Sequence, residues 1–199
     1  MKKVYVIMAV AVLFFLSGSC SMIGKRYSIL SNKILSVEKC KKQSFKNFSS
    51  YADYLAYIKD DENNTVIHDI LNDTLLDMGV PTTFMLDNKG NYVDISKDED
   101  GNYRCSGDKR EAFSNLSPDI PCIITEQPES VRKTLNSLVY WTEPLVLPDA
   151  DCDYVVFVLM HSNINFFNNN IRKMFNDCHN NKYYKIKTVF VSCNFIRED

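Results

Sequence analysis

The stretch that decides the fold is Tyr154-Val155-Val156-Phe157-Val158-Leu159-Met160, an uninterrupted run of apolar, mostly β-branched or aromatic residues. Such a run is typical of a strand that is buried on both faces of a sheet. Apolar residues then recur at helical spacing from Ile164 to Cys178, and a second apolar strand follows over 186–195. A strand, a helix and a strand in this order predict a βαβ unit with a right-handed crossover and a parallel strand pair.

Upstream of this unit, residues 80–95 predict a β-hairpin. Two runs rich in β-branched and aromatic residues flank the turn sequence Asp87-Asn88-Lys89-Gly90. A short strand is expected near 120–124, and Pro128 suits the first turn of a helix. The proline-containing residues 144–152 predict a linker or a rigid crossing, and therefore a possible sub-boundary of the domain.

Two further helices are expected before the hairpin. Ser49 and Ser50 offer an N-cap to a helix whose apolar residues recur at helical spacing: Tyr51, Tyr54, Leu55 and Ile58. A second helix is predicted over Thr65–Met78, ended by Gly79. The fold class is therefore α/β, and we expect residues 47–199 to form a single domain.

The amino terminus has the pattern of an export signal. Lys2 and Lys3 precede an apolar run over 4–16, and the small residues Ser17-Gly18-Ser19 lead to Cys20. The apolar run is shorter than the ~20 residues that a membrane-spanning helix needs. We therefore expect a signal peptide over 1–19, followed by a polar tether over 20–46.

Ser17-Gly18-Ser19-Cys20 resembles the cleavage site of bacterial lipoproteins. The resemblance implies that Cys20 becomes the first residue of the mature protein and carries the lipid, including acyl chains such as palmitate. The membrane is then a partner through this anchor, and the location is the bacterial cell envelope, at the outer membrane or cell surface. Ordinary secretion with an incidental Cys20 and an uncleaved anchor are the alternatives.

Charge and cysteine usage exclude several classes of function. The formal net charge of −2 leaves no basic footprint for nucleic acid, and the lysines of 41–46 read as a solvated face or tether. No pair of cysteines has the C-x-x-C spacing of a zinc knuckle or a dithiol centre, and no metal or other cofactor is expected. Outside the cytosol we expect at least one disulfide, and buried thiols are the alternative. Besides Cys20, the cysteines are Cys40, Cys105, Cys122, Cys152, Cys178 and Cys193.

The sequence Gly79-Val80-Pro81-Thr82-Thr83-Phe84, with the turn behind it, resembles the cis-proline segment and hairpin of thioredoxin-like exported bacterial proteins. The βαβ unit is similar to that family's first strand, active-site helix and second strand. The resemblance implies a thioredoxin-like fold and a cis peptide at Pro81. Because the two halves occur in reversed order, the fold is expected to be permuted or to consist of degenerate copies.

The predicted ligand site lies after the buried strand. Where the family carries its dithiol, this chain has His161, Ser162 and Asn163, and no thiol is present. Ligands gather at the carboxyl ends of strands in open α/β sheets, beside helix N-termini. His161, Ser162, Asn163 and Pro81 are therefore the candidate ligand-binding residues. Capping of the helix by Ser162 or Asn163, with His161 on the surface, is the alternative.

These patterns predict a non-catalytic binding or interaction lipoprotein with a protein or peptide partner. No nucleophile elbow, zinc-binding helix motif or phosphate loop is present, so no catalytic residue is assigned. The alternative is a thiol-dependent envelope oxidoreductase that uses Cys152 or Cys178. Such an enzyme needs an accessible thiol of low pKa, whereas the binding module predicts buried or disulfide-bonded cysteines. A third alternative is a chain that ends early, directly after its last strand.

Overall fold

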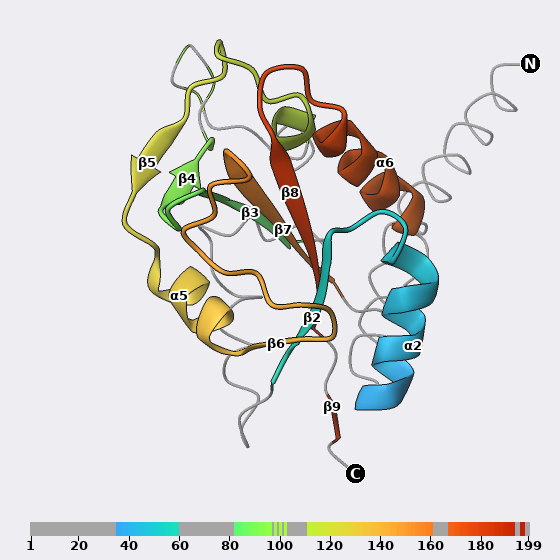
Figure 1. The fold of residues 1–199 in the computed structure, drawn as a ribbon. Coiled ribbons are helices and arrows are strands. Elements are labelled where there is room, and N and C mark those ends of the chain that lie inside the picture. Colours follow the sequence, from blue (N-terminus) through green and yellow to red (C-terminus); the bar gives the residue numbers. More distant parts are fainter. Residues whose placement is uncertain are drawn as a thin grey trace, which may run out of the picture.

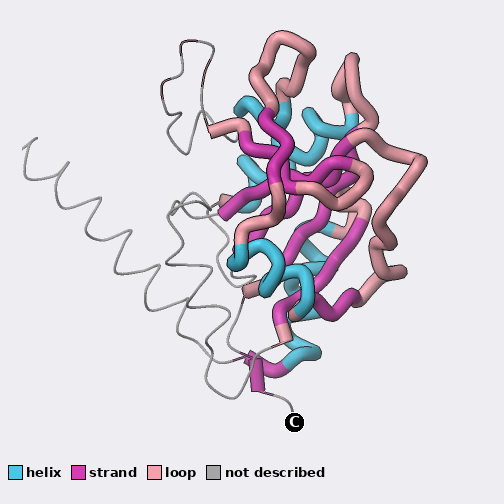
Figure 2. The backbone as a smooth tube through the Cα atoms, turned by 90° about the vertical axis from the view of Figure 1, so that its left-hand side faces the viewer, coloured by secondary structure: helices cyan, strands magenta, loops and turns pink. Residues whose placement is uncertain are grey.

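A seven-stranded mixed sheet with helices on both faces forms the centre of the protein (Figure 1). Its strand order is β5-β4-β3-β7-β8-β2-β6. Figure 2 shows these strands running through the middle of the described chain. The computed structural model describes residues 35–59, 82–96, 98, 100, 102, 111–160, 167–193 and, for the backbone, 196–197.

The strands of the large sheet are β2 (Tyr54–Ile58), β3 (Thr82–Asp87), β4 (Tyr92–Asp94), β5 (Ile123–Thr125), β6 (Leu138–Tyr140), β7 (Tyr154–Met160) and β8 (Ile186–Ser192). The longer helices are α2 (Val37–Phe48), α5 (Glu129–Asn136) and α6 (Asn168–His179). A separate parallel pair joins β1 (Leu35–Ser36) to β9 (Ile196–Arg197).

The predicted βαβ unit is confirmed. β7 and β8 pair in parallel, with Val158 opposite Phe190, and α6 connects them along the chain. β3 lies antiparallel on the other side of β7, and β2 lies parallel on the other side of β8. The unit therefore occupies the centre of the sheet.

Alternate side chains of β7 enter two separate cores. Val156 and Val158 contribute to the core between the sheet and its first face, which α2, α6 and residues 111–116 cover. Val155 and Phe157 contribute to the core on the second face, which α5 and residues 141–153 cover. We call these the α6 face and the α5 face. Figure 1 shows α2 and α6 on one side of the sheet and α5 on the other.

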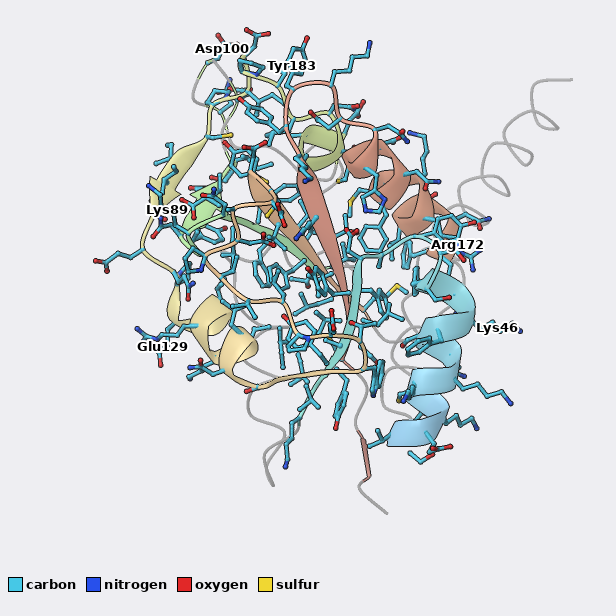
Figure 3. The ribbon with its side chains drawn as sticks, in the orientation of Figure 1. Lys46, Lys89, Asp100, Glu129, Arg172 and Tyr183 are labelled. Carbon is cyan, nitrogen blue, oxygen red and sulfur yellow. The ribbon has the colours of Figure 1, made fainter. Side chains whose placement is uncertain are left out.

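Phe48, at the end of α2, ties the helices of the α6 face to the sheet. Its fully buried ring stacks on Phe190 with a centroid distance of 4.0 Å and meets Phe175 edge-on at 6.3 Å. Arg172 of α6 adds a polar contact, because its Nε donates a hydrogen bond of 2.8 Å to the backbone oxygen of Asn47 (Figure 3). A cation beside the last carbonyls of a helix is favourable.

Part of the predicted tether is wrong, because residues 37–48 form α2. All four lysines of this helix are exposed, and three of them belong to the predicted solvated face over 41–46. The opposite side buries Cys40, Ser44 and Phe48, which are spaced four residues apart. The folded part therefore begins before residue 47, and α2 has a buried side opposite its exposed lysines.

The predicted helix over 51–58 is also wrong. Residues 54–58 form β2, and four of its five residues are buried. Apolar residues at every position of a short run fit a buried strand as well as a helix, so periodicity alone cannot separate the two. Parallel pairing with β8 supplies backbone hydrogen bonds to these residues and makes them a strand.

The hairpin is confirmed as β3 and β4, joined by a turn in which Gly90 has φ of 91°. The Oδ1 atom of Asp87 accepts hydrogen bonds from the backbone amides of Lys89 and Asn91, at 2.9 and 2.8 Å. An Asx turn of this kind explains why Asp87 begins the turn. The short strand β5 forms near its predicted place, and α5 begins after Pro128 as predicted. The helical spacing of Val131, Leu135, Leu138 and Val139 predicts a longer helix, which is wrong, because Leu138 and Val139 pair with β2 as part of β6. The helix predicted over 65–78, with its His68, lies outside the described residues.

Residues 144–152 pack onto the sheet. Leu145 and Leu147 contact the core of the α5 face, and Cys152 is buried in it. Lys187 of β8 donates to the carboxylate of Asp149. These contacts make the segment a cover for the α5 face.

We predict that Phe48→Ala lowers the free energy of unfolding by about 3–5 kcal/mol, because it removes a fully buried ring and leaves a cavity against Phe190. Urea unfolding followed by circular dichroism measures the change. The exposed Lys46→Ala on the same helix is the control and is expected to stay within about 0.5 kcal/mol of wild type. Equal losses in the two variants would contradict the role of α2 in the core.

Candidate functional site

The described residues next to the predicted ligand residues lie where β7 ends, at one end of the central strands. Thr82 at the start of β3 pairs with Leu159, and Met160 at the end of β7 pairs with Ser192. The backbone amide of Cys193 closes this edge by donating to the oxygen of Met160 at 3.1 Å. Two strands and the chain after β8 therefore converge at the carboxyl end of β7.

Pro81 directly precedes Thr82, and His161 directly follows Met160 in the sequence. The structure thus brings together the described residues next to both parts of the predicted site. Pro81, Cys20 and the predicted His161, Ser162 and Asn163 themselves lie outside the described residues.

A groove runs along α6 from the end that follows these residues. Its first part has a cavity volume of about 310 Å³, at the lower end of the roughly 300–1,000 Å³ typical of ligand sites. A second part of about 240 Å³ shares Ser114, Asn115 and Asp177 with the first. The floor is apolar and the rim is charged: Phe167, Ile171 and Met174 lie below, and Glu111, Lys173 and Asp177 lie above. We call this the α6 groove.

The rim of the first part of the α6 groove has two carboxylates and one lysine. Lys173 Nζ lies 2.9 Å from Asp177 Oδ2, one helical turn away, and this hydrogen bond raises the pKa of Lys173. Glu111 adds a second carboxylate on the opposite side. An apolar floor under a polar rim can hold an apolar group while polar neighbours orient it. The sequence contained no signal for this groove, because residues 111–116 and α6 are far apart along the chain.

Asp53, His179 and Thr188 form a hydrogen-bonded polar cluster at the carboxyl end of α6. Asp53 Oδ2 accepts hydrogen bonds from the amide of Thr188 at 2.7 Å and from its hydroxyl at 3.1 Å. His179 Nε2 lies 2.9 Å from the same carboxylate oxygen and 3.1 Å from the Thr188 hydroxyl.

This cluster is a clasp between helix and sheet. In a catalytic triad one histidine nitrogen faces the carboxylate and the other faces the nucleophile. Here Asp53 and Thr188 both contact Nε2, so the geometry does not relay a proton. The hydrogen bond to Asp53 raises the pKa of His179. Burial raises the pKa of Asp53, but the bonds from His179 and Thr188 outweigh it, and the net pKa is lowered.

The two cysteines proposed for thiol chemistry are buried. Burial raises the pKa of Cys152 to about 11 and that of Cys178 to about 12. Complete burial also raises the pKa of Cys193. Each thiol is therefore almost wholly protonated at neutral pH, and a protonated thiol is a poor nucleophile.

The predicted disulfide is not found among the cysteines that the structure describes. Cys40, Cys122, Cys152, Cys178 and Cys193 are all thiols, and Cys122 is the least buried of them. Cys105 and Cys20 lie outside the described residues. The apolar cores, which need no covalent staple at this chain length, account for the buried thiols as small hydrophobic side chains.

Comparison with family models, with curated proteins and with solved structures finds no match to this chain. Within the described ranges, no group of histidine, cysteine and acidic side chains is arranged to hold a metal ion. Among the helices that the structure describes, none has the length and apolar character needed to cross a bilayer.

We predict that His179→Gln destabilises the protein more at about pH 5.5 than at about pH 9. A raised folded pKa means that the contribution of His179 is fully present below its unfolded pKa of ~6.5 and is lost as pH rises through the folded value. Asp53 has a lowered folded pKa, so its contribution appears above its unfolded value and is lost only in acid. Because both side chains are partly exposed, we expect a difference of only about 0.5 kcal/mol.

Urea unfolding of the two proteins at both pH values measures this difference. Lys173→Gln is the control, because it breaks an exposed ion pair on the same helix and leaves the contact between His179 and Asp53 in place. Its effect should be equal at the two pH values. A loss in His179→Gln that is independent of pH would contradict the assignment.

Proposed function

We propose that this protein is a lipoprotein of the bacterial cell envelope, anchored through Cys20, that binds a protein or peptide partner and performs no thiol catalysis. The export pattern of residues 1–20 supports the anchor. The absence of a relay geometry in the Asp53–His179–Thr188 clasp supports a binding role.

The observation that carries the proposal is the environment of the thiols. An envelope oxidoreductase requires a thiolate at neutral pH, held by a positive neighbour or a helix N-terminus. Cys178 lies in the last turn of α6, where the helix dipole disfavours an anion, and its Sγ faces the oxygen of Phe113 at 3.8 Å. Cys152 is buried in the core of the α5 face, and burial and the charge of Asp149 raise its pKa by more than Lys187 lowers it. Both sites oppose ionisation.

The α6 groove is the surface that suits a partner best. It has an apolar floor and a charged rim, and it begins at Phe167, directly after the segment that contains the predicted His161, Ser162 and Asn163. An apolar side chain of a partner fits the floor, and its polar neighbours meet Glu111 and Asp177 on the rim.

The finer proposal for the fold is a permuted thioredoxin-like unit. The two segments that carry the resemblance are the hairpin β3-β4 and the βαβ unit, and they form the contiguous strands β4-β3-β7-β8 of one sheet. Two degenerate copies would require two such arrangements. A single permuted unit needs only this one, so it is the simpler proposal.

We predict that the mature chain from the envelope fraction begins at Cys20 and carries a diacylglycerol group, and that Cys152, Cys178 and Cys193 do not react rapidly with iodoacetamide before unfolding. The reason is the burial and the raised pKa of Cys152, Cys178 and Cys193. Intact mass measured before and after unfolding, with alkylation at neutral pH, tests both parts.

Cys20→Ala is the control for the anchor and should yield an unlipidated chain. Cys122→Ser removes the partly exposed thiol and should remove any slow labelling of the folded protein. A rapidly alkylated thiol at Cys152 or Cys178 would contradict the proposal and favour the oxidoreductase. An unlipidated wild-type chain would overturn the anchor.

We predict that Asn170→Trp, which fills the α6 groove from its exposed rim, lowers the yield of a crosslinked complex in the envelope fraction. Asn176→Trp is the matched control, because it lies on the same helix, is exposed and does not line the groove. Crosslinking followed by immunoblotting measures the yield. Equal yields in both variants and wild type would mean that the partner does not use the groove.

A further inference from the structure

β5 is an edge strand of the seven-stranded sheet, and its side chains are exposed on both faces of the sheet. Ile123 and Ile124 are 52% and 57% exposed, and successive side chains of a strand point to opposite faces. Both faces of the sheet are therefore open at this edge. Figure 1 shows β5 as the outermost strand on its side of the described fold, beyond β4.

The other edge strand of the sheet, β6, is built differently. All three of its residues are partly buried, and Leu138 and Tyr140 pack against the core of the α5 face. The chain then continues into Trp141, whose ring stacks on Tyr57 of the neighbouring β2 at 5.0 Å. Of the two edge strands of the seven-stranded sheet, β5 therefore has the more exposed side chains.

β5 is held firmly from one side. Three residue pairs join it to β4, with Val93 opposite Ile124 at the centre. The side chain of Gln127 donates to the backbone oxygen of Gly90 and fastens the end of the strand to the hairpin turn. Its outer backbone groups form a ready template for a further strand. Pro121 and Pro128 limit that strand to the residues between them.

The charge around β5 and the area that it can bury indicate which kind of partner strand it fits. Asp119 and Glu126 flank β5 and are exposed, and residues 111–131 contain no lysine, arginine or histidine. Lys89 of the hairpin turn lies on the same side of the described fold (Figure 3). Pairing of two β5 strands would bring their carboxylates together and bury far less than the roughly 1,200 Å² of a stable dimer. A short basic peptide meets neither obstacle.

We infer that β5 accepts an added strand from a partner protein: an extended segment with consecutive apolar residues flanked by lysine or arginine. Main-chain hydrogen bonds to the outer edge of β5 hold the segment, and alternate side chains contact Ile123 and Ile124 on the two faces. This surface is distinct from the α6 groove and from Cys20, so it stands or fails independently of the proposed function.

The test is a titration of the isotope-labelled mature chain with two blocked peptides, acetyl-Lys-Val-Ile-Val-Lys-amide and acetyl-Glu-Val-Ile-Val-Glu-amide, followed by amide chemical shifts. We expect saturable shifts in β5 and β4 with the lysine peptide at millimolar concentration. The glutamate peptide should bind at least about tenfold more weakly, and Glu126→Lys should reverse this preference.

Ile124→Lys should weaken binding of the lysine peptide by about tenfold or more. Val146→Lys is the matched control, since Val146 is 70% exposed and belongs to the cover of the α5 face. Three outcomes would overturn the inference: no saturable shift, shifts confined to the α6 groove, or self-association in sedimentation that Ile124→Lys abolishes. The last would identify a second copy as the occupant.

Discussion

The parallel pairing of β7 and β8 imposes the constraint on which the rest of the structure depends. Every side chain from Val155 to Met160 is buried, and so is nearly all of β8. Two adjacent strands that are apolar on both faces must be covered on both faces, because each exposed side chain would forfeit about 1.5–3 kcal/mol of burial. The helices α2 and α6 cover one side, and α5 with residues 141–153 covers the other.

Because both faces of the sheet are covered, burial also limits which thiols can react. Thiols that lie under the covering layers lose the solvent that would stabilise a thiolate, which is why Cys178 and Cys193 serve as packing groups. The clasp of Asp53, His179 and Thr188 likewise fastens α6 to the sheet. The surfaces that we propose for partners lie outside the buried cores, in the α6 groove and at β5.

Prediction from sequence succeeded where the signal was local and failed where it was not. The run over 154–160 and the turn at Asp87–Gly90 specify their own structure, because burial on both faces and turn chemistry are written in adjacent residues. The lysines of α2 dominate its composition and predict a polar tether, although the opposite side of the helix is buried. The apolar run of β2 is compatible with both a helix and a buried strand, so the spacing of Tyr54, Leu55 and Ile58 predicts the wrong element. The α6 groove had no local signal at all.

The sequence by itself determined the strand–helix–strand unit, the hairpin and the export pattern, since each depends on residues that are neighbours along the chain. Only the tertiary structure decided that β3 lies beside β7 and β2 beside β8. It also decided that Cys40, Cys152, Cys178 and Cys193 are buried, and that the side chains of β5 are exposed whereas those of β6 are partly buried. These features depend on which distant segments share a face or an edge, and pairing between distant segments is not specified by neighbouring residues along the chain.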